Sequence, residues 1–282
     1  MAPLTGRSTL ACRRASKAVG AALALWAGAA LGGPPERVVS INLCTDQLAM
    51  LLAKPGQLVS ISRISQDPNV SVMLEEALGY PINHGQAEEV FRLNPDLVLA
   101  GQFTSSYTVG LLRRLGVEVA QLPIVTSLDQ IPGAIREVGR LLGRAAQAET
   151  LATEFSADLA ALRANPSNRP RAALHYANNY TSGDKSLAND ILTAAGFANV
   201  ALEAGLSGGG TLPMERLLML MPDLIISGQH YPGASRSEAV LTHPAMNALR
   251  DRHAGSALSD AEWVCGTPAV LRAISRLQEA YE

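Results

Sequence analysis

The sequence predicts an α/β protein of two lobes with parallel central sheets, joined by a single long helix, and three observations lead to this fold class. Short runs of β-branched and apolar residues alternate with segments of helical periodicity, a pattern typical of a parallel sheet covered by helices. The segment "LNPDLVLAGQ" (93–102) recurs almost unchanged as "LMPDLIISGQ" (220–229). A long helical pattern without any strand separates the two copies.

The recurrence indicates two lobes of similar construction. It extends upstream at a constant offset, so that Glu88 aligns with Glu215 and Asp96 with Asp223. A solenoid would repeat every 20–50 residues or so, and the separation here is that of a small domain. Chance similarity between helix–turn–strand units of like composition is the alternative explanation.

The first 29 residues have the three regions of a secretory signal peptide. Basic residues between Arg7 and Lys17 precede the apolar run "AVGAALALWAGAALG" (18–32), and Ala27-Gly28-Ala29 within this run supplies the small-x-small cleavage pattern. A bilayer-spanning helix needs about 20 apolar residues, so this run is short for one. We therefore expect a cleaved signal peptide at 1–29 and a periplasmic mature chain, with an uncleaved anchor as the alternative. Cys12 precedes the apolar run, so the chain is not predicted to be a lipoprotein.

The composition and net charge argue against nucleic acid as a partner. Hydrophobic residues make up 48% of the chain and charged residues 17%, as in an ordinary globular protein. The net charge is −2 and no basic block occurs, so nucleic-acid binding is not expected.

The first lobe is predicted to span residues 30–127. Its expected strands are 37–42, 57–62, 95–102 and 117–122. Its expected helices are 45–54, 87–94 and 108–116. Thr45 or Asp46 would cap the first helix and Gly116 would close the last. The run "DLVLA" is apolar at consecutive positions, which indicates a strand buried on both faces.

Residues 128–168 are predicted to form a helical linker that includes the long bridging helix. A first helical stretch ends at Gly143, and the second, 144–165, would be about 30 Å long. The second lobe is predicted to span 169–282. Its expected strands are 171–177, 222–229 and 256–260, and its expected helices are 186–196 and 267–282.

The candidate ligand site follows from the strand ends, because open α/β sheets bind ligands beyond the carboxyl ends of their strands. Only 4% of the residues are aromatic, yet five of them fall in these loops: Phe103, Tyr107, Tyr180, Tyr231 and Trp263. This concentration favours a ligand with a large flat or apolar surface, whereas packing at a lobe edge is the alternative for each ring. The other candidates for ligand contact are Cys44, Thr45, His84, His230 and Glu262.

Cys44 and Cys265 each follow a predicted strand, one in each lobe. A disulfide between them would span the cleft mouth and restrict ligand entry, and an oxidising compartment permits it. Free thiols and direct ligand contact are the alternatives. His84 and His230 could ligate a metal carried by the ligand, and Cys44, Cys265 and His84 are an alternative soft-metal site. We expect no built-in metal or cofactor.

The sequence offers no convincing motif of catalysis. It contains no HExxH. "GLSGG" (205–209) has the letters of GxSxG but does not follow a clear predicted strand, as a nucleophile elbow must, and "SGGGT" (207–211) matches neither a dinucleotide fingerprint nor a P-loop. We expect 207–211 to be a flexible loop at the cleft rim. The chain is therefore not predicted to be an enzyme, and an exported enzyme on this two-lobe scaffold is the alternative.

Four segments, "RVVSINLCTDQLAMLLA", "PDLVLAG", "YTSGDKSLANDILTAAG" and "PDLIISG", resemble periplasmic substrate-binding proteins of ABC importers for iron–siderophore complexes, haem and vitamin B12. The resemblance covers almost the whole mature chain, in order. It implies two Rossmann-like lobes bridged by one long helix, a ligand held between them and little closure on binding. It also implies a monomer that delivers a corrinoid such as vitamin B12, or a ferric siderophore, to an ABC permease dimer in the inner membrane. A haem-binding transport protein is the alternative. The resemblance also implies that Tyr180 and Trp263 lie near the positions of corrin-contacting aromatics in the vitamin B12-binding members.

The same resemblance gives Glu88 and Glu215 a role. In the resembled family, one glutamate per lobe at this place pairs with arginines of the two permease subunits, so we expect Glu88 and Glu215 to dock the permease. The alternative is local, because an acid near a helix N-terminus stabilises the helix by about 0.3–1 kcal/mol.

Overall fold

The computed structural model describes residues 33–228, 235–250, 254–257 and 260–281. Residues 33–282 form one compact unit. The expected signal peptide at 1–29 and two of the expected ligand contacts, His230 and Tyr231, lie outside the described residues.

The first sheet contains five parallel strands in the order β3-β2-β1-β4-β5. The strands are β1 (Val38–Ser40), β2 (Leu58–Ser62), β3 (Ile82–Asn83), β4 (Leu97–Gly101) and β5 (Glu118–Leu122). The helices are α1 (Leu43–Leu52), α2 (Leu74–Ala77), α3 (Ala87–Arg92) and α4 (Ser106–Arg114), with a 3₁₀ turn η1 (Arg63–Gln66) after β2. Leu97 and Leu99 pack toward α1, whereas Val98 and Ala100 pack toward α3 and α4. β4 is therefore buried on both faces, as its continuous apolar run predicts.

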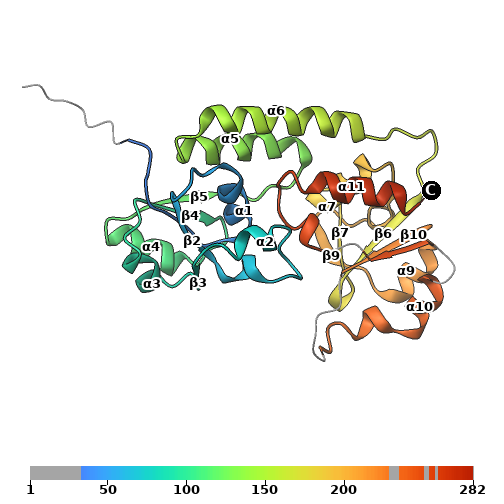
Figure 1. Ribbon diagram of the computed structural model, residues 1–282. Helices are drawn as coiled ribbons and strands as arrows, with labels where there is room; N and C mark the ends of the chain where they lie inside the picture. The colour runs from blue at the N-terminus through green and yellow to red at the C-terminus, as the bar shows by residue number, and fades with distance from the viewer. Residues whose placement is uncertain (1–32, 229–234, 251–253, 258–259, 282) are drawn as a thin grey trace, which may run out of the picture. The chain divides into compact units, whose positions relative to one another are not determined.

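Two packed helices follow this sheet. They correspond to the helical stretch that was expected to end at Gly143 and to the long helix expected after it. A short 3₁₀ turn η2 (Leu128–Gln130) leads into α5 (Ile131–Leu141), and Gly143, at φ 69°, reverses the chain into α6 (Ala145–Leu162). The two helices lie side by side (Figure 1). They approach closely because Gly139 has no side chain, and a Cβ at this position would collide with Ala148. The 18-residue α6 is the predicted long helix, about 27 Å in length.

The second sheet contains four parallel strands in the order β11-β10-β6-β8. The strands are β6 (Arg171–His175), β8 (Ala198–Asn199), β10 (Leu224–Ser227) and β11 (Ala254–Ala257). The helices are α7 (Leu187–Ala194), α8 (Val200–Glu203), α9 (Met214–Leu220), α10 (Pro244–Arg250) and α11 (Val270–Glu279). Three 3₁₀ turns, η3 (Ala177–Asn179), η4 (Ala239–Thr242) and η5 (Asp260–Glu262), complete the order. The predicted α/β class with parallel central sheets is confirmed.

The glycine-rich segment 207–211 is not the flexible loop expected from its composition. Its residues Gly209–Thr211 form strand β9, which pairs antiparallel with β7 (Tyr180–Ser182). The Tyr180 side chain lies directly over Gly209, where any Cβ would collide with the phenol. Glycine is therefore needed there to let a large side chain cover the two-stranded ribbon.

Neither expected residue caps the first helix. The side chain of Asn42 does so instead, accepting hydrogen bonds from the N–H groups of Cys44 (3.1 Å) and Thr45 (3.4 Å). The preceding strand ends at Ser40, earlier than the expected position 42, so the helix also begins earlier. Gly116, at φ 83°, ends α4 as predicted.

The recurring segment builds equivalent structure in both lobes. Asp96 Oδ2 accepts the N–H of Arg37 (2.9 Å) at the start of β1, and Asp223 Oδ2 accepts the N–H of Arg171 (2.8 Å) at the start of β6. The arginines also bond the ends of the helices that lead into β4 and β10. Arg37 Nη2 donates to Leu93 O (2.8 Å) after α3, and Arg171 Nη1 donates to Met221 O (3.2 Å) after α9. Each aspartate therefore joins a helix–strand unit to the neighbouring strand.

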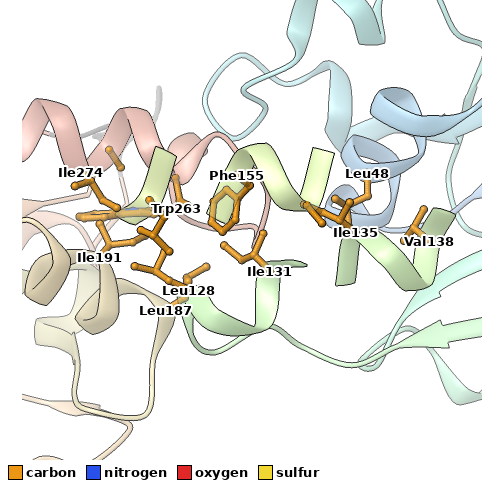
Figure 2. Close-up of a cluster of buried hydrophobic side chains, with 14 of the residues drawn as sticks. Leu48, Leu128, Ile131, Ile135, Val138, Phe155, Leu187, Ile191, Trp263 and Ile274 are labelled. Atoms are coloured by element: carbon orange, nitrogen blue, oxygen red, sulfur yellow. The ribbon is translucent and has the colours of Figure 1, made fainter. Parts of the chain in front are cut away.

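One hydrophobic cluster runs through both lobes and the helices between them. Figure 2 shows its central members, with Leu48 of α1 near Ile135 and Val138 of α5, and Phe155 of α6 followed by Trp263 beside Ile191 and Ile274. The two lobes and the helices between them therefore share one continuous core. Within the described ranges, no helix has the length and apolar character needed to cross a bilayer.

Candidate functional site

A cavity of about 150 Å³ lies at the carboxyl ends of β1, β4 and β5. This is the edge at which open α/β sheets bind their ligands, a tendency that we call the strand-end rule. The first lobe and α5 provide most of its lining. These residues are Asn42, Cys44, Thr45 and Leu48 around α1, Gly101, Gln102 and Phe103 after β4, Leu122, Pro123, Ile124 and Val125 after β5, and Ala134. The second lobe contributes Val264 and Gly266.

Local interactions shape the first-lobe wall. A Cβ on Gly101 would lie 2.8 Å from Asn42 Nδ2, so glycine allows the end of β4 to pass beside the helix cap. Thr45 is buried, and its hydroxyl donates to Asn42 O (2.9 Å) and contacts Ser40 Oγ (2.7 Å). Gln102 Oε1 accepts the N–H of Ile124 (3.2 Å), which ties the loops after β4 and β5 together. The wall is thus built largely from backbone and neutral side chains.

The second-lobe wall is joined covalently to the first lobe. Cys44 and Cys265 form a disulfide, with Sγ atoms 2.09 Å and Cα atoms 5.1 Å apart. The sequence permitted this disulfide but did not decide between it and the alternatives of free thiols or direct ligand contact. Next to it, Gly266 packs so closely on Val125 that a Cβ would collide with that side chain. Both contacts lie at the cavity.

Exposed apolar side chains surround the cavity. Phe103 is 80% exposed, Ile124 56% and Val264 52%, and all three line it. Large apolar side chains are seldom left this accessible in a group unless something covers them. Tyr107, in the first turn of α4, is also exposed but is not part of the lining.

Trp263 does not lie in the cleft as expected. It is 5% exposed and belongs to the hydrophobic core beside Ile191 and Ile274 (Figure 2). The neighbouring Val264 lines the cavity instead. The strand-end rule located the segment correctly but could not say which of two successive side chains faces the ligand.

Glu262 is also wrong as a ligand contact. Its side chain is 5% exposed, and Oε1 lies 3.1 Å from Arg276 Nη1 and 3.6 Å from Arg272 Nε. Glu262 therefore joins η5 to α11 through ion pairs with two arginines whose own side chains are exposed, rather than facing a ligand.

Tyr180 and His84 remain accessible, but neither is part of the cavity lining. Tyr180 packs over Gly209, with its ring centroid 6.3 Å from that of Tyr176. His84 Nδ1 lies 3.1 Å from Glu89 Oε1, and its backbone N–H donates to Glu89 Oε2 (2.8 Å). Partial burial acts to raise the pKa of Glu89, but the hydrogen bonds from His84 outweigh it and the pKa is lowered. Among the residues that the structure describes, no three His, Cys, Asp or Glu side chains cluster as metal ligands.

Glu88 and Glu215 occupy equivalent places in the first turns of α3 and α9. Both are exposed. Neither carboxylate forms an ion pair with another described residue.

Asp46 lies on α1, the helix that forms part of the cavity wall, and hydrogen-bonds residues at the end of β2 and in η1. This aspartate was not predicted from the sequence to have a role in the site. It is fully buried on α1, and its Oδ2 accepts the N–H of Ser62 (3.1 Å) and the hydroxyls of Ser62 and Ser65 (2.7 Å for Ser65). Burial raises the pKa of Asp46 from 3.8 to about 6, although these serines act to lower it. An acid inside an otherwise apolar helix, "TDQLAMLL", was the available signal.

Residues 38–253 match the family described as Periplasmic binding protein. A cobalamin-binding protein of Halobacterium salinarum is 29% identical over 221 residues, which cover 76% of this chain and 60% of that relative. The chain thus spans less than two thirds of that relative's length. Among solved structures, the periplasmic haem-binding protein RhuT of Roseiflexus is similar with a TM-score of 0.71 at 23% identity, over 88% of this chain and 99% of that one. The vitamin B12-binding protein BtuF of Vibrio cholerae is similar with a TM-score of 0.66 at 20% identity, over 88% and 96%.

Proposed function

Because the chain belongs to the periplasmic binding protein family, we propose that it captures a corrinoid at the cavity between α1, β4, β5 and Val264–Gly266 and delivers it to an ABC importer. The observation that carries the choice of ligand is the absence of charge: no described residue that lines the cavity has a charged side chain. Asn42 and Gln102 contribute neutral amides instead; their oxygens accept backbone N–H groups, so a ligand would meet the amide NH2 groups.

This chemistry suits a corrinoid better than its rivals. A corrin ring is flat and apolar on its faces and is edged with neutral amides, which pair well with Asn42 and Gln102. Haem carries carboxylates and catecholate siderophores are strongly anionic, so both would favour cationic partners. The name of the cobalamin-binding relative, at 29% identity, supports the same ligand.

The size of the cavity suggests how the ligand lies. Pockets for ligands of moderate size span roughly 300–1,000 Å³, whereas this cavity holds about 150 Å³. A corrinoid would therefore place one edge in the cavity and lay a ring face on the exposed side chains of Phe103, Ile124 and Val264. Covering these three side chains would supply most of the apolar burial.

A ligand panel tests the proposal. The mature protein is titrated with cyanocobalamin, haemin and ferrichrome, and binding is followed by quenching of tryptophan fluorescence. Trp263 is the single tryptophan after residue 29. Cyanocobalamin is expected to bind at least tenfold more tightly than the other two. Tighter binding of haemin or ferrichrome would replace the corrinoid in the proposal, and chemically unaltered ligand recovered after binding is expected of a carrier rather than an enzyme.

The partner is proposed to be a two-fold permease dimer that contacts Glu88 and Glu215. Their exposure, their freedom from ion pairs among the described residues and their equivalent positions in the recurring segment support this role. The chain would dock as a monomer, with one carboxylate for each permease subunit.

We further propose that residues 1–29 are removed on export and that the mature protein is periplasmic without a lipid anchor. The mature chain would divide into a first lobe at 30–127, a helical linker at 128–168 and a second lobe at 169–282. The limits of the two parallel sheets support these boundaries. The mass of the exported protein is expected to correspond to a chain that begins near residue 30.

A further inference from the structure

A short stretch of the second lobe completes the cavity wall. Of the described lining residues, Val264 and Gly266 come from that lobe and the others come from 42–134. Between these two residues lies Cys265, which is 1% exposed and bonded to Cys44, itself a lining residue. The disulfide is thus part of the wall rather than a distant crosslink.

The segment that carries this wall is irregular, since it lies between η5 and α11. Both of its ends are buried. Trp263 packs in the common core, and Thr267 turns back on the segment with its N–H donating to Cys265 O (2.9 Å). In its middle, the disulfide and the packing of Gly266 on Val125 hold it to the first lobe.

We propose that the Cys44–Cys265 disulfide is a positioning element of the ligand site, and that its reduction weakens ligand binding without unfolding either lobe. Reduction by a dithiol breaks the S–S bond and adds two electrons and two protons, which gives two thiols and the oxidised dithiol. Val264 and Gly266 would then separate from the first lobe, while the core around Trp263 and Ile131 keeps the lobes together. The inference rests on the proposed function for the place of the ligand.

A purely stabilising crosslink behaves differently. It would lower the free energy of unfolding on reduction but leave the affinity of the folded protein unchanged. Affinities are therefore compared at a temperature at which far-ultraviolet circular dichroism shows every form to be folded.

The experiment titrates cyanocobalamin into oxidised protein, dithiothreitol-treated protein and the C44S/C265S double variant. The latter two are expected to bind at least tenfold more weakly than the oxidised protein. The double variant is also the matched control, because dithiothreitol should not change its affinity further; the full sequence has Cys12 as its only other cysteine. Affinities of folded oxidised and reduced protein that agree within twofold would overturn the proposal.

A second readout needs no ligand. Amide hydrogen exchange is measured across 263–267 in ligand-free protein, and reduction is expected to accelerate it there at least tenfold while leaving α1 and α11 unchanged. If oxidised protein fails to bind cyanocobalamin, the corrinoid proposal fails, and unaltered exchange at 263–267 would separately overturn the positioning role.

Should the double variant not fold, Gly266→Ala keeps the disulfide but forces the wall away from Val125. Its oxidised form is also expected to bind at least tenfold more weakly, and wild-type affinity would contradict the inference.

Discussion

The carboxylate of Asp190, on α7 of the second lobe, accepts a hydrogen bond from the backbone N–H of Leu128, with N and Oδ2 2.8 Å apart. Leu128 begins η2 and is fully buried. Asp190 therefore fixes the entry to the connecting helices against the second lobe. It comes from the segment "SLAND", one of those that carry the resemblance to binding proteins.

Asp190→Ala is expected to lower the free energy of unfolding by about 1–3 kcal/mol, because it leaves the N–H of a buried residue without its acceptor. Asp190→Asn keeps an acceptor oxygen and should lose less than half as much. Urea unfolding of both variants measures the difference. Equal losses in the two variants would show that charge, rather than the hydrogen bond, is what matters.

Trp263→Ala is expected to destabilise the protein by about 3–5 kcal/mol, as for other large side chains removed from a packed core. The loss is expected because Trp263 is only 5% exposed and packs in the core beside Ile191 and Ile274. Trp263→Phe should lose much less and should bind ligand as tightly as the wild type. Thermal unfolding and calorimetric titration check the two effects, and a large loss of affinity in the folded phenylalanine variant would return Trp263 to the ligand surface.

Much of the sheet structure was predictable because its longer strands are rich in apolar and β-branched residues. β4 is a continuous apolar run, and β2 contains Leu58, Val59 and Ile61, so both are recognisable without tertiary information. The two-residue strands β3 and β8 are not, and β9 (Gly209–Thr211) contains two glycines, which are depleted in strands. Its pairing depends on β7 and on Tyr180 covering the glycines, which are contacts distant in sequence.

The candidate site was predictable to within a loop but not to within a side chain. The strand-end rule led to Cys44 and Phe103, which line the cavity. The same rule led to Trp263, whereas the neighbouring Val264 is the lining residue, because direction in an irregular segment depends on packing. Burial of Glu262 against Arg272 and Arg276 was likewise invisible, since α11 follows it in sequence but covers it only in the fold.

Asp46 should make stability depend on pH. Its pKa is about 6 in the folded protein, above the unfolded value of 3.8, so the folded state binds the proton more tightly. The stabilisation by this proton is fully present below pH 3.8 and is lost as pH rises through 6. The shift corresponds to a loss on the order of 3 kcal/mol, at 1.36 kcal/mol per pKa unit.

The comparison variant is Asp46→Asn, which does not titrate. Urea unfolding at pH 4 and pH 7.5 should show the wild type losing stability relative to the variant as the pH rises, because other titrating groups affect both proteins alike. Any constant cost of the substitution cancels in this comparison. A constant difference between the two proteins at both pH values would contradict a raised pKa.

Glu88→Ala combined with Glu215→Ala should abolish ligand uptake in cells while leaving ligand affinity in solution unchanged. Both carboxylates are exposed, and neither pairs with another described residue, so the free protein loses little beyond a helix-dipole contribution of about 0.3–1 kcal/mol at each site. A desolvated interfacial ion pair behaves differently, since truncating one partner costs about 2–5 kcal/mol. Two such losses would prevent a two-fold permease from engaging both lobes.

The matched control is Glu154→Ala with Asp158→Ala, which removes the same charge from exposed positions of α6 and should leave uptake intact. Uptake and solution affinity are measured for both double variants, and wild-type uptake by the first would leave Glu88 and Glu215 as helix-stabilising acids only.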